Sequence, residues 1–155
     1  MAFGTASEIF TNTMLDIFQN TIAMDWGSDD MFVALYGNGG TPAQDASSAN
    51  TAYNAGAWVT ANEIYDGSEW PQAGQALDTD AVSIVSTYNL KFDAADEVST
   101  GTSATLASVY GCLVYDNTLS PKQGFSYHYF GGSQSVTDGT FTVVWNSSGI
   151  ASLTL

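Results

Sequence analysis

The sequence is poor in positive charge. Its 155 residues contain no arginine and two lysines, Lys91 and Lys122, against 16 acidic residues, which gives a formal net charge of −14. Because phosphate groups are bound by basic side chains, we expect neither nucleic acid nor an anionic membrane as a partner. The acids are scattered, and we interpret them as a solvated face that keeps the chain in solution. The alternative is that they keep the outer face of a crowded shell from sticking to DNA and host debris.

Residues that carry chemistry are also few. His128 is the only histidine and Cys112 the only cysteine. A zinc site needs several such ligands, and a Ser-His-Asp hydrolase needs a nucleophile-elbow motif that is missing here. No intrachain disulfide can form, and Cys112 lies in the apolar run 109–115, which is typical of a buried, inert thiol. We therefore expect no enzyme activity, no cofactor and no metal, with a structural or surface role for His128.

Targeting and membrane signals are missing as well. The first residues lack a basic region followed by an apolar core and a cleavage site, so we expect synthesis and folding in the cytoplasm. The apolar runs are shorter than a membrane span. Hydrophobic residues make up 45% of the chain, enough for one core, and the length fits a single domain over 1–155.

The first segment predicts an amphipathic helix over about 5–20. Thr5-Ala-Ser-Glu8 fits a capping box, and the loop-like stretch 25–30 sets the end of the helix near Asn20. We expect its apolar stripe to pack on the domain's own core, and the alternative is that it docks on a neighbour. The stripe consists of Phe10, Met14, Ile17 and Phe18.

From about residue 31 to 155 the pattern predicts a β-rich body. Turn residues separate short apolar or alternating runs, and Asp138-Gly139 fits a tight hairpin turn. The first run is continuously apolar, as in a strand covered on both faces. One helix followed by short strands predicts a mainly β fold, an antiparallel β-sandwich or flattened barrel. The clearest predicted strands are 31–36, 82–92, 107–115, 125–130 (ended by Gly131-Gly132), 141–145 and 150–155.

Several large side chains are candidates for contact with a partner. Aromatic residues often anchor interfaces, and a helical stripe can dock on a neighbour, although most such residues belong to a core. Our candidate interface residues are Phe10, Met14, Phe18, Trp58 and Trp70.

Two acidic groups leave other possibilities open. Glu63, Glu69, Trp58 and Trp70 combine carboxylates with aromatic rings, as sugar-binding clefts do, although we favour an aromatic-anchored acidic loop as the explanation. Asp29-Asp30 and Asp78-Thr-Asp80 could contribute oxygen ligands to Ca²⁺, but neither matches an EF-hand loop.

The predicted opening helix and five further stretches together follow a familiar pattern, and none of them is a catalytic motif. The five stretches are Met31-Phe-Val-Ala-Leu-Tyr36 followed by Thr41-Pro42, Asn62-Glu63-Ile64 leading to Gly74-Gln-Ala-Leu77, Val109-Tyr-Gly-Cys-Leu-Val-Tyr-Asp116, the stretch 129–145, and Gly149-Ile150.

In these stretches the chain resembles a group of small virion proteins of tailed bacteriophages of actinobacteria and other bacteria, called minor capsid, decoration or minor tail proteins. The resemblance implies a structural protein of the virion, assembled in the host cytoplasm, that binds the major capsid protein on the outer head lattice as a homo-oligomer such as a trimer. A tail or neck component is the first alternative. A carbohydrate-binding or host-attachment module is the second.

Overall fold

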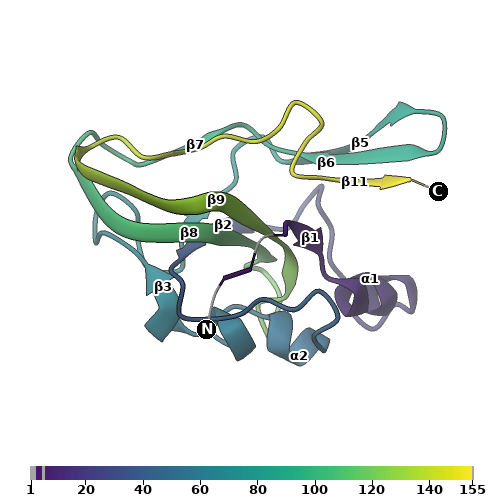
Figure 1. The fold of residues 1–155 in the computed structure, drawn as a ribbon. Helices are drawn as coiled ribbons and strands as arrows, with labels where there is room; N and C mark the ends of the chain where they lie inside the picture. The colour runs from purple at the N-terminus through teal and green to yellow at the C-terminus, as the bar shows by residue number, and fades with distance from the viewer. Residues whose placement is uncertain (1–2, 5, 155) are drawn as a thin grey trace.

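The structure is a computed structural model that describes residues 3–4 and 6–154. It is mainly β, with antiparallel sheets, as the sequence predicts (Figure 1). No helix in this described part is long and apolar enough to cross a membrane. The helices are α1 (Thr11–Phe18), α2 (Ser48–Thr51) and the 3₁₀ turns η1 (Gly56–Trp58) and η2 (Thr60–Asn62). The strands are β1 (Glu8–Ile9), β2 (Met31–Tyr36), β3 (Glu63–Ile64), β4 (Gln75–Ala76), β5 (Ala81–Ser86), β6 (Asn89–Asp93), β7 (Glu97–Val98), β8 (Ala104–Asp116), β9 (Gly124–Gly139), β10 (Thr142–Val143) and β11 (Ala151–Thr154).

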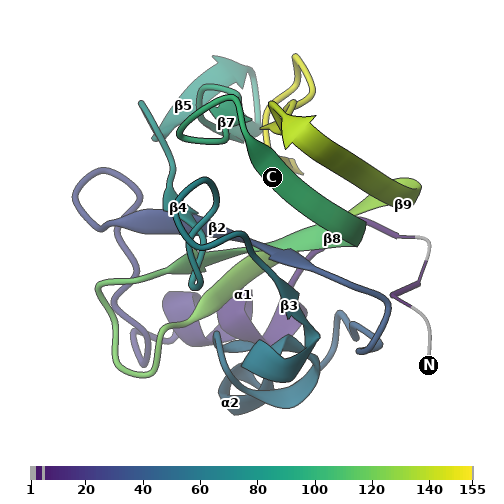
Figure 2. The same ribbon diagram turned by 90° about the vertical axis from the view of Figure 1, so that its left-hand side faces the viewer.

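The largest sheet, here called the main sheet, has six strands in the order β1-β9-β8-β2-β3, with β4 also paired to β2. Its pairs are antiparallel, as expected from the short connections between the later strands. Strands β8 and β9 form a long curved hairpin through the middle of the molecule (Figure 1). The two smaller sheets lie above this hairpin, and the helices lie below it (Figures 1 and 2).

Both faces of the main sheet are covered, which confirms the prediction drawn from the apolar run 31–36. Val33 and Leu35 belong to one buried cluster, here called the upper core, together with Phe92 of β6 and Ile150, which directly precedes β11. Ala34 and Tyr36 alternate with them along β2 and belong to a second cluster, the lower core. A strand buried on both faces needs apolar side chains at every position, which is the pattern of this run. The lower core consists of Phe3, Phe10, Ala34, Tyr36, Trp58, Leu113, Tyr115 and Tyr127.

The predicted single strand 82–92 is wrong, because two strands occupy this region. Strands β5 and β6 form a hairpin that turns at Thr87 and Tyr88, where Tyr88 has a φ of 68°. β11 pairs with the other side of β6, and we call the sheet β11-β6-β5 the projecting sheet. It extends beyond the end of the main sheet (Figure 1). The alternation runs through the turn unchanged, so the sequence pattern alone did not reveal the reversal.

The predicted helix over 5–20 is also wrong in its first half. Glu8 and Ile9 form β1, which pairs with Tyr127 and Ser126 of β9, and the helix begins only at Thr11. Phe10 is extended and buried in the lower core, so it cannot continue a helix toward Glu8. The proposed capping box therefore does not form through Glu8, and its Thr5 lies outside the described residues.

The predicted strand ends at the C-terminal side also need correction. Gly131 and Gly132 do not end β9, which continues to Gly139 through positive φ angles of 79° and 147° at these two residues. The strand predicted over 141–145 is reduced to β10, and β10 pairs with β7 instead of forming a hairpin at Asp138-Gly139. The final strand is confirmed over Ala151–Thr154, whereas Leu155 lies outside the described residues.

Candidate functional site

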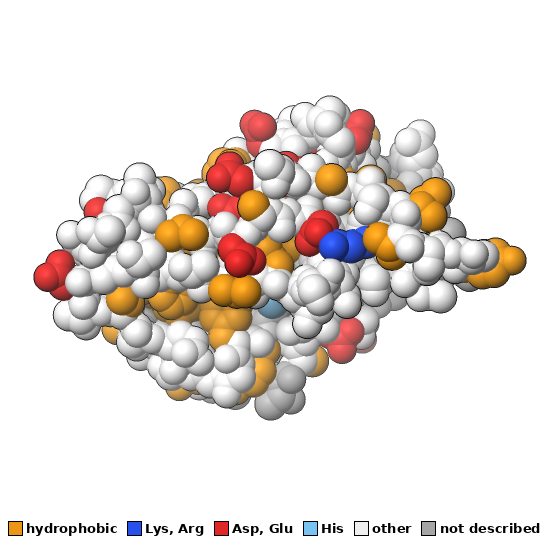
Figure 3. All heavy atoms as spheres, turned by 90° about the horizontal axis from the view of Figure 1, so that it is seen from above, with side chains coloured by type: hydrophobic (Ala, Val, Ile, Leu, Met, Phe, Trp, Pro, Cys, Tyr) orange, Lys and Arg blue, Asp and Glu red, His pale blue; other side chains and the backbone are white. Residues whose placement is uncertain are grey.

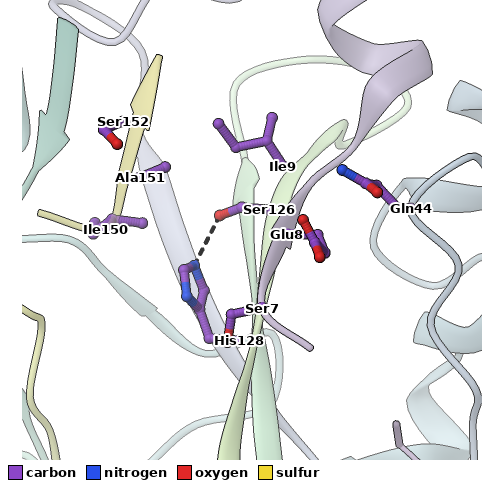
Figure 4. Close-up of a pocket in the computed structure, with 9 residues that line it drawn as sticks. All are labelled: Ser7, Glu8, Ile9, Gln44, Ser126, His128, Ile150, Ala151 and Ser152. Atoms are coloured by element: carbon purple, nitrogen blue, oxygen red, sulfur yellow. Dashed lines mark hydrogen bonds between the residues drawn. The ribbon is translucent and has the colours of Figure 1, made fainter. Parts of the chain in front are cut away.

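A polar pocket lies on the upper face of the main sheet, between β1, β9 and β11 (Figure 4). Its volume is about 330 Å³. Figure 4 shows Ser126 and His128 on one face of β9, pointing toward the segment of Ile150 and Ala151. The pocket is lined by Ser7, Glu8, Ile9, Gln44, Ser126, His128, Ile150, Ala151 and Ser152.

The histidine and serine in this pocket are hydrogen-bonded to each other. Ser126 Oγ and His128 Nε2 are 3.0 Å apart, and the ring of Trp145 packs edge-on against the imidazole with 5.3 Å between ring centroids. Burial lowers the pKa of His128 to about 4, because the charged imidazolium loses its hydration there. The imidazole is therefore neutral at physiological pH and can share one proton with the serine hydroxyl.

A serine beside a histidine is the first requirement for nucleophilic catalysis, but this pair lacks the others. Ser126 is 0% exposed, so a substrate carbon cannot reach its hydroxyl. Glu8 lines the same pocket, yet within the described part of the chain no carboxylate is hydrogen-bonded to the imidazole. The arrangement fits a structural role best, in which the buried serine and the partly buried histidine satisfy each other.

A second depression is apolar and lies between α1 and the projecting sheet. Its volume is about 520 Å³, and Val82 and Phe92 form one wall while Met14 and Ile17 form the other. We call it the apolar groove. Its remaining lining residues are Ala23, Met24, Asp25, Trp26 and Phe125.

Large hydrophobic side chains beside the groove are exposed to solvent. Ile84 is 79% exposed on β5, and Phe18 is 70% exposed at the end of α1. Val82, which lines the groove, is also exposed, and so are Val85, which lines a separate pocket with Lys91, and Tyr88 at the hairpin turn. Seen from above, the projecting sheet reaches out to the right of the molecule and carries hydrophobic side chains at its tip (Figure 3). Clustered exposed apolar side chains of this kind mark contact surfaces.

The projecting hairpin carries little charge. Between residues 81 and 92 the one charged residue is Lys91, and its amino group lies 2.6 Å from the carboxylate of Asp93. The apolar surface on this hairpin is therefore not interrupted by unpaired charge.

Three of the five candidate interface residues are in the wrong place for contact with a partner. Phe10 and Trp58 are buried in the lower core, and Trp70 is buried against Phe141 in the upper core. These large rings fill the two cores and have no free face, which corrects the prediction. Met14 lines the apolar groove and Phe18 is exposed, so these two remain available to a partner.

The suggested sugar-binding combination is likewise not assembled. Trp58 and Trp70 offer no exposed ring face for stacking. Glu63 is buried, where its carboxylate accepts hydrogen bonds from Tyr53 Oη at 2.8 Å and from the Ala73 amide at 2.7 Å. Burial raises the pKa of Glu63. Its contacts tie a loop to the main sheet, which is a structural role.

Four exposed residues of the hairpin, Val82, Ile84, Val85 and Tyr88, are not among the candidates predicted from the sequence. All four lie within residues 82–92, which the sequence pattern predicted as one strand. The chain instead turns at Thr87-Tyr88, which leaves β5 at the edge of its sheet. An edge strand has fewer neighbours to cover its side chains.

Comparison of the chain with known protein families, with curated proteins and with solved structures finds no match.

Proposed function

We propose that this chain is a structural protein of a bacteriophage virion, a decoration or minor capsid protein that binds the outer lattice of the head. The observation that carries the proposal is the apolar contact surface formed by the groove, Phe18 and the β5–β6 hairpin. The sequence resemblance to small virion proteins supports the location in a virion.

The charge of the molecule fits a partner with basic residues. The net charge of −14 lies outside the hairpin of residues 81–93, whose Lys91 and Asp93 cancel. A partner with an apolar centre and basic residues around it would match both features, because complementary charge speeds association and excludes wrong partners. We propose the major capsid protein as this partner.

The free edges of the projecting sheet provide a means of forming an oligomer. β5 and β11 are the two outer strands of this sheet, and neither contains a charged residue. Charged side chains usually protect exposed edges from pairing with another chain. A contact from β5 of one copy to β11 of the next is head-to-tail, and such contacts form a ring such as a trimer when the rotation between copies closes.

In fold class, we propose an elaborated antiparallel β-sandwich, in which the two smaller sheets form a second layer on the main sheet. Phe92 from β6 and Val143 from β10 support this, because both pack into the upper core with Val33 and Leu35 of β2.

Co-sedimentation with heads that lack this protein tests the proposed partner. Wild-type protein should bind the heads, and Ile84→Asp should weaken binding at least about tenfold by placing a charge in the apolar surface. Val144→Asp is the matched control, because Val144 is 71% exposed and lies outside the projecting sheet. Equal loss with both variants would contradict the assignment of the surface.

Immunogold labelling of complete particles tests the location. Label on heads in many copies supports a decoration protein. Label on tails or necks in few copies would replace it with the tail or neck alternative. Particles without label would refute the virion proposal itself.

A further inference from the structure

The acidic turn before β2 and the end of β8 come together at one edge of the main sheet. Met31 of β2 is the register partner of Asp116 at the end of β8. Two hydrogen bonds hold the segments together: the Asn117 amide donates to the Asp30 carbonyl at 2.9 Å, and the Asp30 amide donates to Thr118 Oγ1 at 2.8 Å. This pairing brings the carboxylate of Asp29 against that of Asp116.

Asp116 is held in place by the backbone but is only partly satisfied. Its Oδ1 accepts hydrogen bonds from the amides of Thr118 at 2.8 Å and Leu119 at 3.3 Å. Its Oδ2 is buried and has no donor, and the residue is 0% exposed. The adjoining group, Asp29, is itself a carboxylate and cannot donate while it is ionised. A buried carboxylate oxygen without a donor is costly and calls for a positive partner.

The chain's own positive side chains are engaged elsewhere. Lys91 pairs with Asp93, and the Lys122 amino group lies over the ring of Tyr53, 5.6 Å from its centroid. The chain has no arginine. Neither lysine is therefore placed to neutralise Asp29 and Asp116, which leaves a shared proton or a cation from solution as the source of positive charge.

We propose that Asp29 and Asp116 bind a hard divalent cation, with Ca²⁺ as the preferred ion. Both carboxylates are oxygen donors, and Asn117 Oδ1, one residue further, is also buried without a partner and is available as a neutral oxygen. Ca²⁺ accepts carboxylate, amide and water oxygens in flexible geometry, whereas Mg²⁺ demands a stricter octahedron. This inference does not depend on the virion function proposed above.

The surroundings determine the strength of the site. Asp25 is tied to Asp29, since the Asp25 amide donates to Asp29 Oδ2 at 2.6 Å. The charge of Asp30 acts on Asp80, so the two acidic segments noted in the sequence lie near each other. However, no group of three or more His, Cys, Asp or Glu side chains among the described residues is arranged for a metal. Two carboxylates with neutral oxygens predict affinity in the class of extracellular Ca²⁺ modules, with Kd of about 10⁻⁴–10⁻³ M.

Thermal unfolding of the full chain tests this site. The protein is freed of metal with EDTA, dialysed at pH 7.5 and heated with 10 mM CaCl₂ or with NaCl at the same ionic strength. For Kd near 10⁻⁴ M, Ca²⁺ should raise Tm by about 5–10 °C above the NaCl sample. Isothermal titration calorimetry should show about one ion per chain.

Asp29→Asn is the informative variant, because Asp29 is a turn residue outside the cores and the substitution also removes a like charge. It should fold and lose the Ca²⁺-dependent rise in Tm. Asp45→Asn is the matched control, since Asp45 is exposed and removes the same charge elsewhere. It should keep the rise. The proposal is overturned if Ca²⁺ does no more than NaCl, or if Asp29→Asn responds as the wild type does.

Discussion

Acidification should destabilise the protein through His128, and the size of the effect follows from its burial. The imidazole has an ordinary pKa of 6.5, and burial lowers it to about 4 in the folded chain. Between pH 6.5 and 4, His128 is therefore protonated in the unfolded chain but neutral in the folded chain. The stability from this group is fully present above pH 6.5 and is lost as the pH falls toward 4. This interval corresponds to about 3 kcal/mol of unfolding free energy.

The measurement compares wild type with His128→Gln, because glutamine keeps a donor and an acceptor for Ser126 but does not titrate. Urea unfolding at pH 7, 6, 5 and 4 gives the unfolding free energy of each protein. The 16 acidic residues, including Glu8 in the same pocket, titrate in both proteins and largely cancel in the difference. Wild type should lose about 3 kcal/mol relative to the variant between pH 7 and 4.

A difference between the two proteins that stays constant from pH 7 to 4 would refute this reasoning. It would mean that water hydrates the imidazole and that its pKa is ordinary in the folded state. An NMR titration of the His128 ring protons provides the independent check. A midpoint near 6.5 in the folded protein would contradict the burial seen between β9 and Trp145.

Three further outcomes follow from packing and backbone geometry. Trp70→Ala should lower the unfolding free energy by about 3–5 kcal/mol, because Trp70 fills the upper core. Ile84→Ala should change it by less than about 0.5 kcal/mol, because Ile84 is exposed. Urea unfolding measures both, and similar losses would contradict these placements. Gly74→Ala should lower the unfolding free energy by about 2 kcal/mol or more, because Gly74 has a φ of 80° and an added Cβ would overlap the carbonyl oxygen of Val33. An unchanged unfolding free energy in the same assay would contradict the close approach of this loop to β2. Cys112 is buried in the main sheet, so it should react with a thiol reagent in urea but not in native buffer; rapid native labelling would show that the sheet opens.

Sequence patterns predicted what local periodicity controls. The run 31–36 gave a strand covered on both faces because its side chains have to fill two cores, and the structure confirms it. Burial of Cys112 followed from the same kind of run and is also confirmed. Antiparallel pairing followed from connections too short for a helical crossover.

Other features depended on partners far along the chain. Glu8 and Ile9 were predicted to be helical. Their pairing with Tyr127 and Ser126 of β9 outweighs the weak local preference for a helix. Gly131 and Gly132 were predicted to end a strand. β9 continues past them because it pairs with β8 on both sides of these residues. Propensity and spacing contain no information about such long-range pairing.

The candidate contact residues also depended on the topology, which the sequence pattern did not reveal. Large aromatic residues were chosen as contacts because of their size, and size instead made Trp58 and Trp70 core residues. The exposed residues Val82 and Ile84 are of types that are usually buried, so the sequence gives no sign of their exposure. Only the topology, which leaves β5 at the edge of the projecting sheet, makes them a surface.

The charge distribution connects the two proposals. Like charges spread over a small molecule repel, so a chain with a net charge of −14 resists close contact with copies of itself and with other acidic proteins. The β5–β6 hairpin, whose Lys91 and Asp93 pair with each other, projects away from the body, where contact brings together no unpaired charge of the hairpin (Figure 1). A cation held by Asp29 and Asp116 would lower the negative charge beside the apolar groove, which Asp25 also lines. If both proposals hold, Ca²⁺ should strengthen binding to heads in the wild type and not in Asp29→Asn, and co-sedimentation of the two proteins with and without Ca²⁺ measures that coupling.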